Sequence, residues 1–217
     1  MCGKFTQMLS WATLHDLADI INAPGHAPGG AHSDTEEFTT PMRFAHVVRL
    51  GDGGGREAVR MRWGFADMRA KNPLEKPKHM HARAETIDTL PTFANAFAHN
   101  RGLIFVKDFN IGEEVTPRKT VQHVVRPRDG KPLALGVIWE RWINPSSGEL
   151  LTFVMITVPA NALIGAKTDR MPAVIVPENF AKWLGEEPAH PLELKAMLQT
   201  VEGDWDMQPQ KPKAPPA

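Results

Sequence analysis

Residues 133–158 read LALGVIWERWINPSSGELLTFVMITV and contain two long runs of apolar and β-branched residues. The runs at 133–142 and 150–158 have the composition of strands, and NPSSGE between them is typical of a turn. Similar runs occur at 102–109 and 121–127, and GDGGG joins two more, at 43–50 and 57–63, into an expected hairpin. Many strands in close succession with few helices predict one mainly antiparallel β core and not βαβ units.

Four segments have helical patterns: 9–21 with Ser10 as its N-cap, 90–99, 177–184 and 191–198. The predicted fold class is therefore α+β, a single barrel-like, mainly antiparallel β core with peripheral helices. Residues 1–203 are expected to form one domain. Residues 204–217, which end in QPQKPKAPPA, are expected to be a disordered Pro/Lys-rich tail.

Composition excludes several classes of protein. The chain has 217 residues, a formal net charge of zero and one cysteine, which rules out an internal disulfide framework and fits a reducing cytoplasm. No apolar run reaches the ~18 residues of a membrane span, and the N-terminus lacks the pattern of a secretory signal. No Cys/His spacing predicts a metal site, and GDGGG lacks the Lys-Ser/Thr of a phosphate loop, so no cofactor is expected.

The single cysteine, Cys2, directly follows Met1. If Met1 is removed, Cys2 carries a thiol and an α-amine on one carbon. These groups titrate near ~8.5 and ~8, so each is partly nucleophilic at neutral pH. Such a pair attacks an aldehyde with the amine and closes a five-membered ring with the thiol. The ordinary alternative is a small residue at a frayed chain end.

Seven short motifs, taken in order, resemble the SRAP family (SOS-response-associated peptidase). They are MCGKF (1–5), WGF (63–65), ARAET (82–86), RGLI (101–104), GVIWERW (136–142), ITVPAN (156–161) and DRMPAVIV (169–176). The resemblance implies a DNA damage (SOS) response protein with a basic groove for single-stranded or abasic DNA. It also implies that the N-terminal cysteine traps an abasic-site aldehyde as a thiazolidine crosslink. The peptidase label refers to removal of the residues ahead of that cysteine.

The chain departs from the family at the partners of the cysteine. His81 stands in place of the family asparagine, Ile111 in place of the glutamate and Thr168 in place of the histidine. Glu113 and Glu114 follow the glutamate position by two and three residues, and Lys4 replaces an arginine. These changes matter because the reaction needs proton transfers, each typically worth ~10²–10⁴-fold in rate.

Three hypotheses follow. In the first, the site is rebuilt, with Cys2 as nucleophile, His81 as base or hydrogen-bond partner, and Glu113 or Glu114 reaching in by a register shift. In the second, the activity has decayed and the fold acts only as a DNA- or protein-binding module, as in a phage- or plasmid-type accessory protein. In the third, Cys2 and His81 act on a small substrate in a closed pocket. Whether the chain is an enzyme, and its oligomeric state, stay open.

Basic residues supply the candidate DNA contacts. The resemblance implies phosphate contacts for Lys4, Arg83 and Arg170, and the alternative for the two arginines is a structural salt bridge, for Arg83 with Glu85. The densest basic stretch is expected to follow a DNA backbone. It contains Arg60, Arg62, Arg69, Lys71, Lys76 and Lys78. Of the tryptophans, Trp63 is expected in the core, and one of Trp139 and Trp142 at a rim.

Overall fold

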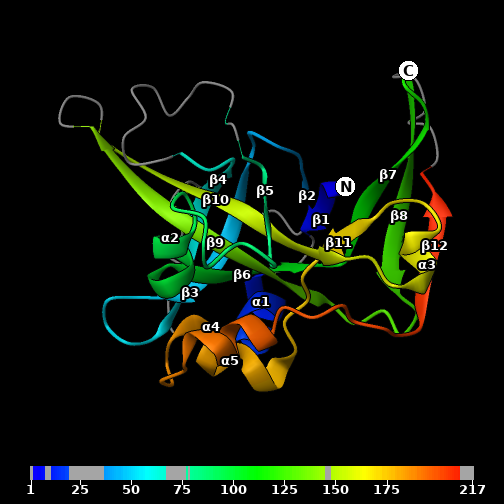
Figure 1. Ribbon diagram of the computed structural model, residues 1–217. Coiled ribbons are helices and arrows are strands. Elements are labelled where there is room, and N and C mark those ends of the chain that lie inside the picture. The colour runs from blue at the N-terminus through cyan, green and yellow to red at the C-terminus, as the bar shows by residue number, and fades with distance from the viewer. Residues whose placement is uncertain are drawn as a thin grey trace, which may run out of the picture.

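The two runs at 133–142 and 150–158 form strands β9 (Leu133–Asn144) and β10 (Gly148–Pro159), which pair antiparallel as predicted. They belong to a computed structural model that describes residues 2–7, 11–19, 37–66, 77, 79–144 and 148–210. In Figure 1 they form the long hairpin that crosses the molecule. Their apolar composition and their pairing place them at the centre of the core.

A closed ring of five strands surrounds one part of this core. Going round it, β10 pairs with β4, β4 with β3, β3 with β6, β6 with β9 and β9 with β10. Only the β4–β10 contact in the ring is parallel. The other members are β3 (Phe44–Leu50), β4 (Arg56–Trp63) and β6 (Arg101–Val106), and β3 and β4 are the predicted hairpin. Two short strands also pair with β10: β5 (His81–Arg83) and β11 (Arg170–Pro172).

A second sheet has the strand order β12-β8-β7-β1-β2, and β7, β8 and β12 lie to the right of β1 in Figure 1. Its members are β1 (Cys2–Gln7), β2 (Glu37–Thr39), β7 (Asp108–Thr116), β8 (Lys119–Pro127) and β12 (Trp205–Pro209). Strand β12 corrects the expected boundary at residue 204. It pairs with β8 along its whole length, and Trp205 is buried, so the folded domain continues through these residues. Residues 211–217 lie outside the described part of the chain.

The helices are short and peripheral, as the predicted fold class requires (Figure 1). They are α1 (Trp11–Ala18), α2 (Ala94–His99), α3 (Ala162–Gly165), the 3₁₀ helix η1 (Pro177–Asn179), α4 (Phe180–Leu184) and α5 (Pro191–Ala196). All four predicted helical segments contain one, while the proposed cap Ser10 lies outside the described residues. None of the described helices has the length and apolar character that crossing a bilayer requires.

The tryptophans are more deeply buried than the sequence suggested. Trp63 is fully buried, as predicted, and stacks on Phe153 at 6.1 Å between ring centroids. The expectation that Trp139 or Trp142 lies at a rim is wrong, since their exposed fractions are 9% and 7%. Residues three apart in a strand face opposite sides, so β9 is covered on both faces here. Neither ring offers a free surface for a base.

Candidate functional site

Cys2 begins β1, an inner strand of the second sheet that pairs with β7 and β2. The alternative of a small residue at a frayed chain end does not hold, because Cys2 lies in a paired strand. The β1–β7 register slips between Cys2 and Lys4, and Cys2 then pairs with Ile111. Phe5 and Phe109 are also paired, and Ile111 lies two residues beyond Phe109, so the slip turns the Cys2 side chain to the same face as these core residues.

Burial keeps the Cys2 thiol protonated. The side chain is 1% exposed, and its Sγ donates to the Lys4 carbonyl oxygen at 3.3 Å. Burial raises the pKa of the Cys2 thiol to about 12, against small opposing effects of hydrogen bonds with the Lys4 and Asn110 backbones. The ordinary thiol value near ~8.5 assumed from the sequence does not hold for this environment. With Met1 ahead of it, Cys2 also carries an amide in place of an α-amine.

His81 hydrogen-bonds to the backbone of Cys2. It begins β5, whose parallel pairing with β10 sets His81 beside Met155. Its ring stands edge-on to Trp63, with 5.8 Å between centroids and an 88° angle. Desolvation lowers the pKa of His81, and a backbone hydrogen bond with Cys2 partly offsets this effect. Its Nε2 is buried and has no hydrogen-bond partner among the described residues. His81 is thus a neutral imidazole with an unused nitrogen beside the cysteine.

The carboxylate position opposite Cys2 is apolar. Ile111 is fully buried and directly faces Cys2 across the β1–β7 pair. Glu113 lies two residues further along β7, on the same face as Ile111. Glu114 is exposed on the opposite face, which turns it away from Cys2. Thr168 is half-buried in the segment that leads from α3 to β11.

Glu113 is held by two side chains, one from β8 and one from the segment after α3. Its Oε2 lies 2.7 Å from His123 Nε2, and its Oε1 accepts from Lys167 Nζ at 3.0 Å. The hydrogen bonds from Lys167 and His123 lower the pKa of Glu113, so it is a carboxylate at neutral pH. The three residues come from β7, β8 and the segment after α3. We call them the Glu113 cluster.

Sequence reasoning did not assign His123 or Lys167. The pairing of β7 with β8 would have indicated His123, but deriving that pairing requires the position of a bulge, which the sequence does not give. Thr116 pairs with Lys119 at the turn, but the register slips by one between Glu114 and Thr116. His123 therefore pairs with Ile111, whereas an unbroken count would place it opposite Gly112 on the other face.

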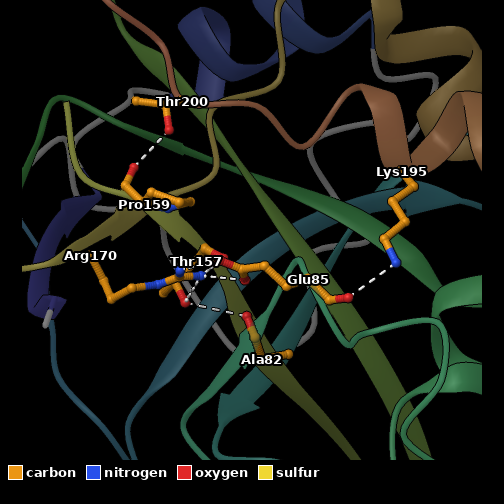
Figure 2. Close-up of polar contacts among 7 residues, drawn as sticks. All are labelled: Ala82, Glu85, Thr157, Pro159, Arg170, Lys195 and Thr200. Atoms are coloured by element: carbon orange, nitrogen blue, oxygen red, sulfur yellow. Dashed lines mark hydrogen bonds and ion pairs between the residues drawn. The ribbon is translucent and has the colours of Figure 1, made fainter.

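Arg170 makes its polar contacts with other residues of the fold (Figure 2). Its side chain is 8% exposed, and its two terminal nitrogens form a bidentate ion pair with Glu85. One of them also donates to the Thr157 carbonyl oxygen at 2.6 Å. Lys195 donates to the Glu85 carbonyl oxygen at 3.1 Å and to Asp88. This geometry favours the structural alternative for Arg170, and the partner of Glu85 is Arg170 where the sequence suggested Arg83. A phosphate contact of Arg170 stays a prediction.

The other predicted DNA contacts have mixed surroundings. Arg83 is exposed at the end of β5, and Lys4 is half-buried in β1. Arg69 and Lys71 lie outside the described residues. Arg62 does not belong to a surface strip, because it is 4% exposed and desolvation lowers its pKa. Arg60 is exposed and stacks on Phe44 at 4.8 Å.

Two cavities bear on the closed-pocket hypothesis, and neither contains Cys2 or His81. One of about 530 Å³ lies at the far end of the second sheet, beside Lys107, Arg126 and Asp206. One of about 350 Å³ lies beside Arg101, Trp139 and Gly185. Within the described residues, no group of three His, Cys, Asp or Glu side chains is arranged to hold a metal ion.

Comparison with known families agrees with the motif order. The family model described as SOS response associated peptidase (SRAP) matches residues 1–212. The chain belongs to the SRAP family. The matched residues include β12.

Two relatives named as abasic site processing proteins match nearly the whole chain. The abasic site processing protein YoqW of Bacillus subtilis is 26% identical over 204 residues, which are 94% of this chain and 89% of the relative. The abasic site processing protein YobE of the same organism is 24% identical, over 94% of this chain and 91% of its own length.

Solved structures share the fold. A protein of Bordetella bronchiseptica matches with a TM-score of 0.77 and 20% identity, over 97% of this chain and 100% of its own. A phage-related protein of the same organism matches with a TM-score of 0.71 and 15% identity, over 97% and 95%.

Proposed function

We propose that this SRAP-family chain binds single-stranded and abasic-site DNA and captures the abasic aldehyde covalently through Cys2 after Met1 is removed. The observation that carries the proposal is the position of Cys2, at the start of a paired strand with His81 against its backbone. Its relatives named as abasic site processing proteins support the substrate class.

The chemistry needs only groups present at this site. The freed amine of Cys2 attacks the aldehyde carbon, and the resulting hydroxyl leaves as water when the C=N bond forms. The Cys2 sulfur then adds to that carbon and closes the ring, while the thiol proton passes to the ring nitrogen. His81 is suited to receive and return a proton, because its imidazole is neutral and its Nε2 is unused.

Cationic side chains would hold the DNA backbone. Arg83 is exposed on the strand that carries His81, and Lys4 lies on the strand that carries Cys2. Phosphate contacts made by such residues release counterions, so the affinity for DNA must fall as salt is added. Arg69 and Lys71 are proposed to extend this surface.

The test uses chain shown by intact mass to begin at Cys2. It is incubated with single-stranded DNA that contains one abasic site, and a heat-stable adduct is sought. We expect an adduct with the processed chain and none with Cys2→Ala or with chain that retains Met1. No adduct from the processed, folded chain would remove covalent capture from the proposal.

A binding module without covalent chemistry is the second candidate. It is favoured by Ile111, which faces Cys2 without a proton to exchange, and by the buried, protonated thiol. The same experiment separates the two functions. Binding that weakens with salt and leaves no adduct would support the module, and affinity that is independent of salt would count against both.

A further inference from the structure

A row of paired residues runs across the second sheet from Cys2. Cys2 pairs with Ile111 on β7, and Ile111 pairs with His123 on β8. Paired residues share a face, and neighbouring strands lie about 4.8 Å apart, so the His123 backbone lies about 10 Å from that of Cys2. Glu113 joins the row diagonally, through its contact with His123.

The Glu113 cluster lies where the buried row meets the surface. The exposed fraction of the side chain is 7% for His123, 26% for Glu113 and 33% for Lys167. A titratable imidazole is therefore anchored inside the sheet, next to a carboxylate that is open to solvent. Lys167 holds Oε1 of Glu113, and Oε2 of the same carboxylate orients the His123 ring.

The described groups around the Glu113 cluster are the ones with which it could exchange protons. Lys167 faces it from the segment after α3, Cys2 lies across β7 on β1, and His81 lies beyond Cys2 on β5. On the other side, β12 brings Pro209, which has no proton to exchange, opposite His123. Cys2 thus has two imidazoles near it: His81 hydrogen-bonds to its backbone, and His123 lies beyond apolar Ile111 in the paired row.

We propose that His123, oriented by Glu113 and Lys167, is a second proton carrier for the reaction at Cys2. The inference rests on the proposed function and assigns its proton transfers to two different histidines. The hydroxyl formed when the amine attacks the aldehyde needs a proton to leave as water. His123 supplies that proton to the substrate oxygen and recovers one from solvent, while His81 serves the nitrogen and sulfur of Cys2.

Charge and exposure fit this role better than a purely structural one. A partly exposed ion pair adds little to stability, while a carboxylate hydrogen-bonded to an imidazole fixes the direction of its ring. The lowered pKa of Glu113 keeps that carboxylate ionised through the range in which an imidazole titrates. The arrangement has the parts of an oriented acid–base group.

The experiment uses chain that begins at Cys2 and compares two aldehydes: glyoxylate, followed by intact mass, and abasic single-stranded DNA. The variants are Glu113→Gln and His123→Gln. Glu114→Gln is the matched control, since Glu114 is adjacent in sequence and exposed on the opposite face. We expect both test variants to form adducts at least ~10-fold more slowly with either aldehyde, and the control to match the unmodified chain.

The pH dependence adds a readout that a structural role would not change. Lys167→Met should raise the pKa of Glu113, so the adduct rate should begin to fall at a higher pH on the acid side. This variant also serves if His123→Gln does not fold, because Lys167 is partly exposed. A Lys167→Met profile that overlays the unmodified one would overturn the proposal.

The outcomes separate the two proposals. If the unmodified chain forms no DNA adduct but the test variants still slow the glyoxylate reaction, the proposed function fails and the proton carrier stands. If folded Glu113→Gln and His123→Gln react with glyoxylate at the unmodified rate, the proton carrier is overturned whatever happens with DNA.

Discussion

Two clusters of charged side chains lie near β1, and they differ in how far their side chains are exposed to solvent. On one side, Arg170 of β11 forms a fork on Glu85, and β11 packs near β1. On the other side, Glu113 of β7 joins His123 and Lys167. The Arg170 side chain is 8% exposed, whereas those of Glu113 and Lys167 are 26% and 33% exposed.

The two clusters differ in whether a side chain can give up or accept a proton near neutral pH. A guanidinium is charged at every physiological pH. The terminal nitrogens of Arg170 donate hydrogen bonds to Glu85 and to the Thr157 carbonyl oxygen, so they hold these two groups in place. The Glu113 cluster contains an imidazole, the side chain that titrates near neutral pH, and two of its members reach solvent. Burial therefore favours a structural role for the first cluster, and the chemical role proposed above concerns the second.

The largest expected effect comes from removing the buried guanidinium. Arg170→Met leaves the Thr157 carbonyl without its charged donor and Glu85 without its fork. The Thr157 carbonyl keeps the hydrogen bond from the Ala84 N–H, so the loss comes from the charged hydrogen bonds of Arg170. Their removal predicts a loss of about 1.5–3 kcal/mol in the free energy of unfolding. Denaturant unfolding measures this loss.

Arg170→Lys is the matched control for this change. It keeps the charge but loses the bidentate fork, so we expect an intermediate loss of stability. If Arg170→Met is as stable as the unmodified chain and instead loses DNA affinity with a weaker salt dependence, Arg170 is a phosphate contact, and the contrast between the clusters fails.

A smaller effect is expected at Glu85, whose side chain is 47% exposed. The hydrogen bonds from Arg170 lower the pKa of Glu85, so its ionised form stabilises the fold above its ordinary value near ~4.3. That stability is lost as the pH falls through the lowered value. Glu85→Gln should therefore be less stable than the unmodified chain at pH 6–7, and the two should converge below about pH 4. Unfolding midpoints across this range measure the convergence, and a constant difference would contradict the ion pair.

Much of the fold was predictable because its strands are long and apolar. The runs around NPSSGE and GDGGG have strong local signals, and both became antiparallel pairs. The short strands were not predictable. β5 and β11 have three residues each, and β12 begins within the predicted tail, so their positions depend on partners far away in the sequence.

The candidate site was predictable in part. The sequence identified Cys2 and His81, and the structure brings them together. It could not identify His123, because a one-residue bulge decides which face of the sheet that side chain occupies. Nor could it predict the raised pKa of Cys2, since burial depends on how the second sheet packs on the barrel.

The smallest expected effect gives the sharpest comparison, because a lysine of nearly equal exposure lies at each cluster. Lys195 and Lys167 are 32% and 33% exposed, and each bonds a carboxylate, of Asp88 and Glu113 respectively. Partly exposed pairs contribute little, so Lys195→Met should cost at most about 1 kcal/mol, and Lys167→Met should shift the unfolding midpoint by a similarly small amount. Only Lys167→Met should change the pH dependence of adduct formation at Cys2. If the two variants change the rate of that reaction equally, Lys167 has no special role in it, and the proposed difference between the Arg170–Glu85 pair and the Glu113 cluster fails.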